Sequence, residues 1–361
     1  MPRFFLHCVI TALMLLGVPS AWSCAICAPA EAQNTLSHQI WAAQSVVLAR
    51  PGQPGQGSSV LAVLKGIAPS AVPAQAGMAE GVMPKVAPDE AQLWVLSAGS
   101  QSWRLAGVVP LGRLPWLQSF ARLGRAADTT TAGWPGRLAF LVKSLEDPNG
   151  LIAQATYEEI AVAPFGAMRT LKPMLDREAL ERWFARPGLA ARRPLYALLL
   201  GVAGNELTAQ GLQAELLSRK SGLASADLSA MLAALIELRG EVALDWIERH
   251  YLADPARPDS DLQAVLLALS VQGSDGQRIS RERIVATYAS WVRQQRSRAG
   301  LVASDLAAWG RWEFGSQFAG ILQSGEALSF ASRYAMVLYL MRSPRPEARQ
   351  ALEALRASGS L

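Results

Sequence analysis

The sequence predicts a mainly α-helical protein that begins with a small β-rich domain. Between residues 45 and 109, short runs rich in β-branched and apolar residues alternate with turns rich in Gly, Pro and Ser. From Trp134 onward, helical patterns separated by glycine and proline follow one another, and no strand pattern interrupts them. Within that part, runs rich in Leu and Ala end at Gly204, Gly240 and Gly273, which are 36 and 33 residues apart. This period is typical of stacked two-helix repeats.

Residues 1–23 are predicted to be a cleavable secretory signal peptide. A basic residue is followed by a largely apolar stretch, Phe4–Val18, and then by the small residues Ala21 and Ser23 ahead of Cys24. This order is typical of export signals, and the apolar stretch is too short to span a bilayer comfortably. We therefore expect an exported protein, periplasmic or extracellular, whose mature chain begins at or near Cys24.

A signal that ends directly before a cysteine also allows a lipoprotein, in which Cys24 would be acylated. The usual lipoprotein signal has Leu three residues before the cysteine, where this chain has Ala21. A membrane is an expected partner only if Cys24 is lipidated.

The composition indicates a folded chain with a large core, because 51% of the residues are hydrophobic and 17% are charged. Its length suggests two domains, which we place at 24–128 and 134–361. The net charge is +5, and no block of five or more like charges occurs. Nucleic acid is therefore not an expected partner.

The first domain is predicted to contain one helix, four strands and a flexible loop. The helix covers Ala28–Gln44, and the loop lies near 67–91, where Ala, Pro and Gly dominate. The four expected strands are Ser45–Ala49, Val60–Leu64, Gln92–Leu96 and Trp103–Val109.

Residues 24–110 resemble the start of a netrin-like, TIMP-type OB-fold domain. The resemblance rests on the N-terminal cysteine motif, the helix after it, and the strands Ser45–Ala49 and Val60–Leu64 followed by Lys65-Gly66. It implies a partial, OB-like β-barrel ahead of the helices.

The segment Leu151–Pro173 resembles a HEAT-repeat unit in its helix-turn-helix layout and its Ala-rich packing face. We extend this resemblance over about 134–355. It implies a HEAT-like α-solenoid that serves as an interaction scaffold.

Cys24-Ala25-Ile26-Cys27 is the sharpest candidate site. The chain has three cysteines, of which Cys8 lies in the signal, so these two thiols can pair only with each other, a partner, a lipid or a metal. A structural disulfide, lipid attachment, thiol-disulfide exchange and metal binding all remain open. Thiolates suit Cu or Zn, and His38 is a possible additional ligand. Otherwise no cofactor is expected.

Catalytic motifs are scarce, which favours a non-enzymatic protein without deciding the question. No nucleophile elbow, HExxH helix, phosphate loop or dinucleotide fingerprint occurs. Adjacent Glu158 and Glu159 point in different directions on a helix and are expected to be solvated or ion-paired at its surface. His250 is expected to be structural, near a helix C-terminus.

The leading hypothesis is an exported, non-enzymatic scaffold whose helical-repeat surface binds an envelope protein of unknown identity. The alternative is thiol-disulfide exchange or copper or other metal handling through Cys24 and Cys27.

Overall fold

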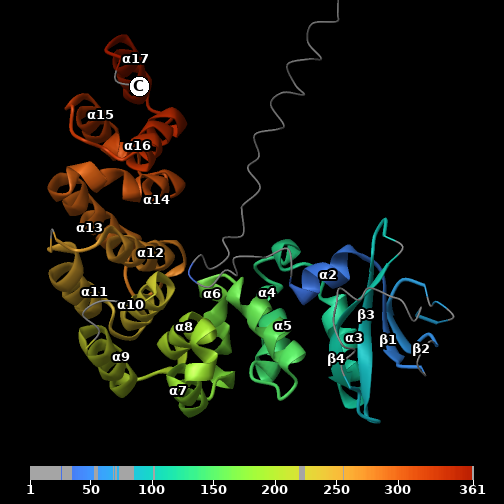
Figure 1. Cartoon of the computed structure of the whole chain (residues 1–361). Coiled ribbons are helices and arrows are strands. Elements are labelled where there is room, and N and C mark those ends of the chain that lie inside the picture. Colours follow the sequence, from blue (N-terminus) through green and yellow to red (C-terminus); the bar gives the residue numbers. More distant parts are fainter. Residues whose placement is uncertain are drawn as a thin grey trace, which may run out of the picture.

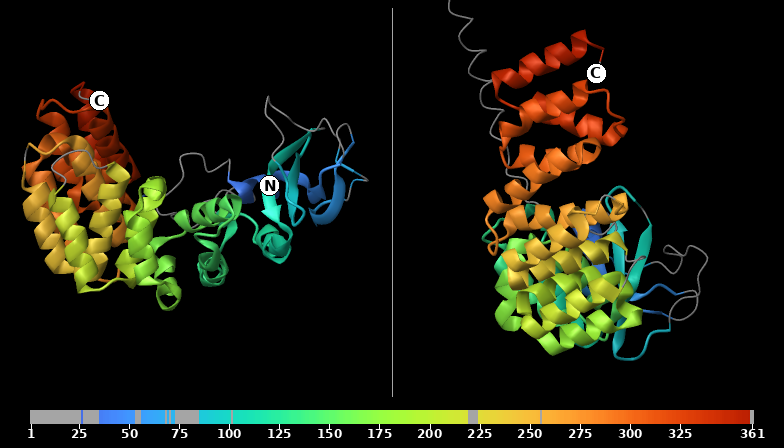
Figure 2. Two further views of the ribbon diagram at one scale, coloured as in Figure 1. Left: turned by 60° about the horizontal axis from the view of Figure 1, so that its bottom comes forward. Right: turned by 90° about the vertical axis from the view of Figure 1, so that its left-hand side faces the viewer.

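The protein is a curved array of helices with a small antiparallel sheet at one end (Figure 1). The computed structural model describes residues 26, 35–52, 56–67, 69, 71–72, 85–100, 102–218, 224–254 and 256–359. The helices lead away from the sheet and then turn, so that the C-terminal helices stand at the far end of an arch (Figures 1 and 2).

All four predicted strands are present and pair in an antiparallel manner. They are β1 (Ala43–Arg50), β2 (Ser59–Lys65), β3 (Glu90–Ser97) and β4 (Trp103–Pro110). The order across the sheet is β2-β1-β3-β4. Both faces of β1 are buried, because its successive side chains point to opposite sides. Val46 and Leu48 belong to the main core, and Val47 and Ala49 belong to a smaller cluster on the other face.

The predicted partial barrel is wrong, because the sheet stays open. β2 and β4 are its two edges and do not pair with each other. The sheet packs one of its faces against helices. Leu36, Ile40, Leu117 and Phe120 of these helices belong to the same hydrophobic cluster as that face. Four strands are also fewer than the five of an OB-type barrel. The helices that supply these side chains are α2 (Leu36–Ala42) and α3 (Leu114–Arg122).

The helix expected at Ala28–Gln44 ends earlier than predicted. α2 stops at Ala42, and the next two residues belong to β1. The β-branched pair Val46-Val47 favours the strand, whose register places Val47 opposite Trp94. Residues 27–34, and 68, 70 and 73–84 of the expected loop, lie outside the described residues.

Within the described chain, everything from Trp134 onward that is regular is helical, as predicted. The first helices are α4 (Trp134–Leu141), α5 (Gly150–Ala161), α6 (Phe165–Met168), α7 (Arg177–Ala185), α8 (Arg193–Ala203), α9 (Glu206–Ser218) and α10 (Ser225–Arg239). The later ones are α11 (Glu241–Ile247), α12 (Asp259–Asp275), α13 (Arg281–Gln294), α14 (Ala303–Ala308), α15 (Gly315–Gln323), α16 (Phe330–Arg342) and α17 (Pro346–Ala357). No described helix is long and apolar enough to cross a membrane.

Two of the three glycines expected to end helices do so. Gly204 and Gly240 are the C-terminal caps of α8 and α10. Gly273 instead lies inside α12, which continues to a cap at Gly276. Gly273 is needed for close packing, since a Cβ there would lie 2.4 Å from the ring of Trp309. The three capping glycines are therefore spaced 36 residues apart both times.

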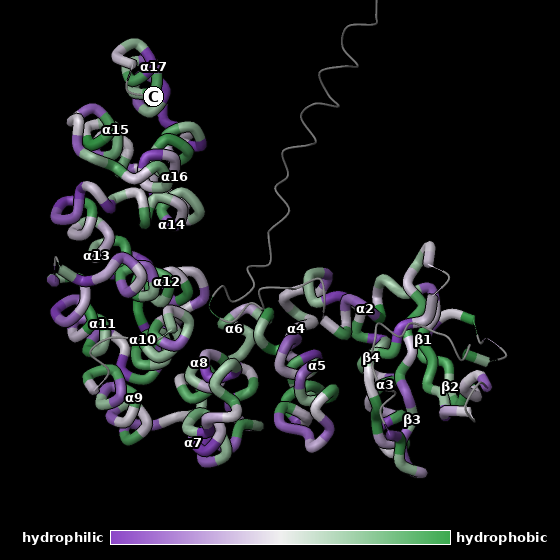
Figure 3. The backbone as a smooth tube through the Cα atoms, viewed as in Figure 1, coloured by the Kyte–Doolittle hydropathy of each residue, from purple (hydrophilic) through white to green (hydrophobic). Residues whose placement is uncertain are grey.

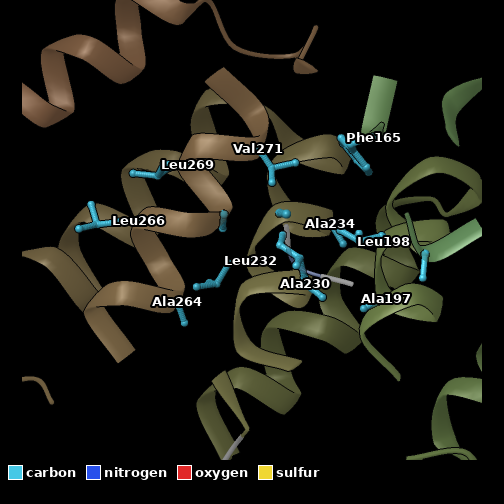
Figure 4. Close-up of a cluster of buried hydrophobic side chains, with 14 of the residues drawn as sticks. Phe165, Ala197, Leu198, Ala230, Leu232, Ala234, Ala264, Leu266, Leu269 and Val271 are labelled. Carbon is cyan, nitrogen blue, oxygen red and sulfur yellow. The ribbon is translucent and has the colours of Figure 1, made fainter. Parts of the chain in front are cut away.

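Helix α10 forms the centre of the helical core. All its side chains from Leu228 to Glu237 are buried, and it lies between α8 and α12 (Figure 4). The approach to α8 is close, because a Cβ on Gly201 would lie 2.8 Å from Cα of Ala234. Polar and apolar segments are interspersed along the whole arch (Figure 3), and one hydrophobic cluster runs from the sheet to α17.

A largely buried ion pair joins the segment after α6 to α10. Arg169, in the 3-10 segment Arg169–Met174 after α6, donates to both carboxylate oxygens of Glu237 on α10 at 2.7 Å. It also donates to the backbone carbonyl of Asp275 on α12, 106 residues away. These contacts hold the segment after α6 against α10 and α12.

Candidate functional site

The two candidate thiols, Cys24 and Cys27, lie outside the described residues, so their chemical state remains a prediction. The residue between them, Ile26, is described. It is 5% exposed and belongs to the main hydrophobic cluster together with Leu36 and Ile40 of α2. Burial of this apolar side chain contributes to the core.

His38, the possible additional metal ligand, is half-buried on α2. Its backbone N–H donates to the capping hydroxyl of Thr35 at 3.3 Å, and its ring centroid lies 5.6 Å from that of Trp41. Among the described residues, no group of three or more His, Cys, Asp and Glu side chains is placed to hold a metal ion. A metal role for His38 thus depends on the two cysteines and stays a prediction.

The other histidine of the described residues, His250, has a structural environment. Its Nδ1 lies 2.8 Å from the backbone carbonyl of Trp246, and its ring stacks on that tryptophan at 4.5 Å. The contact lies in the helical turn Glu248–Leu252 that follows α11, in agreement with the expected helix-terminal position.

A cavity of about 460 Å³ lies where α2, α3 and α4 meet. Its walls include Trp41 and three arginines, Arg122, Arg125 and Arg137. The guanidinium of Arg125 lies 4.2 Å from the ring centroid of Trp41 and binds both carboxylate oxygens of Asp128 at 2.7 Å. Arg125 is therefore already neutralised by a neighbour.

Arg137, at the floor of this cavity, is also fully committed to the fold. It is 5% exposed, and its five N–H groups donate to Glu159, to Thr129, and to the backbone carbonyls of Leu123 and Gly124. The arginine thereby fastens the loop between α3 and α4 to α5. Because two of the three guanidinium groups are satisfied, the cavity does not present converging free charges.

Adjacent Glu158 and Glu159 point apart on α5, as expected, but only one is near the surface. Glu159 is 2% exposed and forms its ion pair with Arg137 inside the protein, so the expected surface location is wrong for it. Glu158 accepts hydrogen bonds from Gln154 and from the backbone N–H of Leu36 at the start of α2. Burial raises the pKa of Glu158, the largest effect on that group.

The most exposed large apolar surface of the described helices is a stripe on α16. Phe330 is 83% exposed, Tyr334 54% and Met341 59%, and the first two rings stack with centroids 6.0 Å apart. These positions follow one helix face, while Met336 and Tyr339 on the opposite face are buried. We call Phe330, Tyr334 and Met341 the α16 stripe.

The stripe was not singled out from the sequence, although its spacing could have revealed it. Positions i, i+4 and i+11 share one side of a helix, and the buried face of α16 is set apart from them by about half a turn. What the sequence does not indicate is which of two apolar faces is covered. Only the packing of η9, α14, α15 and α17 around α16 decides this; η9 is the 3-10 segment Arg296–Val302.

Comparison with known protein families, with curated proteins and with solved structures finds no match for this chain.

Proposed function

We propose that the protein is an exported, non-enzymatic interaction scaffold that binds another envelope protein. The observation that carries this proposal is the α16 stripe, since large contiguous aromatic and apolar side chains left in water are typical of protein-binding surfaces. The committed polar groups support it as well. Glu159 and Glu237 are each paired with an arginine that joins separate elements of the fold.

We further propose that the helical part is a HEAT-like solenoid. The equal 36-residue spacing of Gly204, Gly240 and Gly276 supports it, as does the stacking of α8, α10 and α12 side by side (Figure 4). In such an array each helix pair contacts mainly its neighbours, which leaves extended surfaces for a partner.

Export through residues 1–23 is part of the same proposal, and it places the partner outside the cytoplasm. Lipid attachment at Cys24 would hold the scaffold at a membrane without altering the helices. Mass spectrometry of the native N-terminus distinguishes an acylated Cys24 from a disulfide with Cys27.

The test is a capture experiment with the full mature chain. A Phe330→Ser/Tyr334→Ser variant is compared with the wild type and with Leu207→Ser, a control that changes another exposed apolar residue, 70% exposed on α9. We expect the wild type and the control to bind the same purified envelope protein, and the stripe variant to bind at least about tenfold more weakly. Equal binding by all three proteins would refute the role of the stripe.

The alternative, thiol or metal chemistry at Cys24 and Cys27, is favoured by one observation, the burial of Ile26 between them. Insulin reduction and Cu(I) titration of the wild type and of Cys27→Ser test it. Identical results for the two proteins would exclude this chemistry.

A further inference from the structure

A small cavity between α12 and α14 contains an acidic side chain that forms no ion pair with any residue that the structure describes. The cavity has a volume of about 180 Å³. It is lined by Gln263, Leu266, Leu267 and Ser270 of α12 and by Leu301 and Asp305. The four α12 residues lie on one helix face by their spacing, and α12 and α14 are on the inner side of the arch (Figure 1).

The carboxylate of Asp305 is held in place by two hydroxyl groups. Tyr288 donates to Oδ2 at 2.8 Å and Ser270 donates to Oδ1 at 2.9 Å. Tyr288 is itself fully buried, and its ring stacks on Trp309 with centroids 5.6 Å apart. Its buried hydrogen-bond partners therefore fix the orientation of the Asp305 side chain.

Asp305 differs from the other deeply placed carboxylates of the described chain in its charge balance. Glu159 is neutralised by Arg137 and Glu237 by Arg169. No described lysine or arginine forms an ion pair with Asp305, and burial raises the pKa of its carboxyl group. A cation that enters the cavity would stabilise the ionised form of this partly buried carboxyl group.

We propose that this cavity binds a primary alkylammonium group, presented as a lysine side chain by the partner protein. The three leucines form apolar walls for a methylene stem. Asp305, Ser270 and the amide oxygen of Gln263 supply three acceptors, matching the three N–H groups of an ammonium ion.

An arginine fits this cavity less well. A guanidinium binds a carboxylate best through two parallel hydrogen bonds to both oxygens. Each oxygen of Asp305 already accepts one hydrogen bond, from Tyr288 or Ser270. An ammonium ion needs only one remaining lone pair of the carboxylate.

The cavity is tested by methyl NMR of the full mature chain with labelled leucines. We expect n-butylammonium to shift the methyl signals of Leu266, Leu267 and Leu301 in a saturable way, and n-butanol to leave them unchanged. Asp305→Asn should weaken binding about tenfold, because it removes a charge-assisted hydrogen bond. The matched control is Asp259→Asn, which alters an exposed carboxylate at the start of the same helix α12 and should bind as the wild type does.

A second variant keeps the inference testable if Asp305→Asn does not fold. Leu267→Trp fills the cavity from its partly exposed side while leaving Asp305 intact, and it should abolish the butylammonium shifts. Equal shifts from the amine and the alcohol, or undiminished amine binding by either variant, would overturn the proposal.

The source of the ammonium group is distinguished by comparing an acetylated, amidated lysine peptide with the free polyamine spermidine. Tighter binding of the peptide supports a protein partner, and tighter binding of spermidine overturns it. The assignment to a partner rests on the proposed scaffold function, but amine binding is measured without any partner. Loss of capture with the α16 variant and loss of amine binding with Asp305→Asn therefore report on the two proposals separately.

Discussion

Glu158 and Glu159 illustrate what a single residue's surroundings add to the sequence. Their adjacency correctly predicts that the two carboxylates diverge, because neighbouring helix positions face about 100° apart. It does not predict that one of them is buried. The partner of Glu159 is Arg137, 22 residues away, and the packing of α4 on α5 brings it there. Long-range pairing of this kind leaves no periodic signal in the sequence.

The Arg137–Glu159 pair gives a prediction for single and double variants. Glu159→Ala leaves a buried guanidinium without its counter-charge, so we expect the unfolding free energy to fall by about 3–5 kcal/mol. The double variant Arg137→Met/Glu159→Leu removes both charges and should recover most of that loss. Urea unfolding of the wild type, of Glu159→Ala, of the single changes Arg137→Met and Glu159→Leu, and of the double variant measures this. A double variant whose loss equals the sum of its two single losses would show that the two side chains do not interact, which would contradict the prediction.

The carboxylate of Glu248 predicts how stability depends on pH. Arg283 donates to both of its oxygens at 2.8 and 3.0 Å, which lowers the pKa of Glu248 below its ordinary value. The unfolded chain binds that proton first, at a pH of about 4.3. The contribution of Glu248 is therefore present above that pH and is lost as the pH falls through the lower, folded-state pKa.

Glu248→Gln should accordingly be less stable than the wild type at pH 7, and the difference should shrink below a pH of about 4. Urea unfolding between pH 7 and pH 3 measures it. A difference that does not change over this range would contradict the assignment.

At the scale of single elements, strands were predicted better than helix ends. All four strands followed from short β-branched runs bounded by turn residues, since both signals are local. Helix α3 is not predicted from the sequence, because its short segment follows the strand patterns of the β-rich domain. Gly273 was misread as a helix end because glycine also permits close packing, and the ring it accommodates comes from Trp309, 36 residues later.

Two glycines in helices provide a matched test of close packing. Gly201→Ala would force Cβ to within 2.8 Å of Cα of Ala234, so we expect α8 and α10 to separate and the unfolding free energy to fall by about 1–2 kcal/mol. Gly211, in α9, has nothing within 4 Å of the same atom. There the change to Ala should stabilise by up to about 1 kcal/mol. If thermal unfolding shows that both changes shift the melting temperature in the same direction, this interpretation of Gly201 is contradicted.

Across the whole molecule, the mainly helical fold with its N-terminal sheet was predictable, whereas the surfaces that could bind a partner were only partly so. The α16 stripe has a helical spacing that the sequence displays. The Asp305 cavity does not, because Ser270, Tyr288 and Asp305 come from three different helices and meet only through packing. The candidate thiols Cys24 and Cys27 remain a prediction from sequence.

The Arg169–Glu237 pair predicts how firmly the curve of the arch is fixed. Arg169→Met removes the contacts from α6 to α10 and α12 and leaves Glu237 buried without a cation. We expect a loss of about 3–5 kcal/mol in unfolding free energy. As a control, Arg177→Met removes a half-exposed pair with Glu181 and should cost less than about 1 kcal/mol. Similar losses of unfolding free energy in the two variants would show that Arg169 contributes no more to stability than a half-exposed ion pair does.

The caps Gly204, Gly240 and Gly276 divide the middle of the chain into segments of equal length. If the proposed solenoid is built of 36-residue units, an in-frame duplication of residues 205–240 would add one further helix pair. Insertion of two residues within α10 would instead turn half of that helix by about 200° and carry its alanines away from α8. With the proposed solenoid we therefore expect the chain to accept whole added units, and to accept shorter insertions only in the connecting loops.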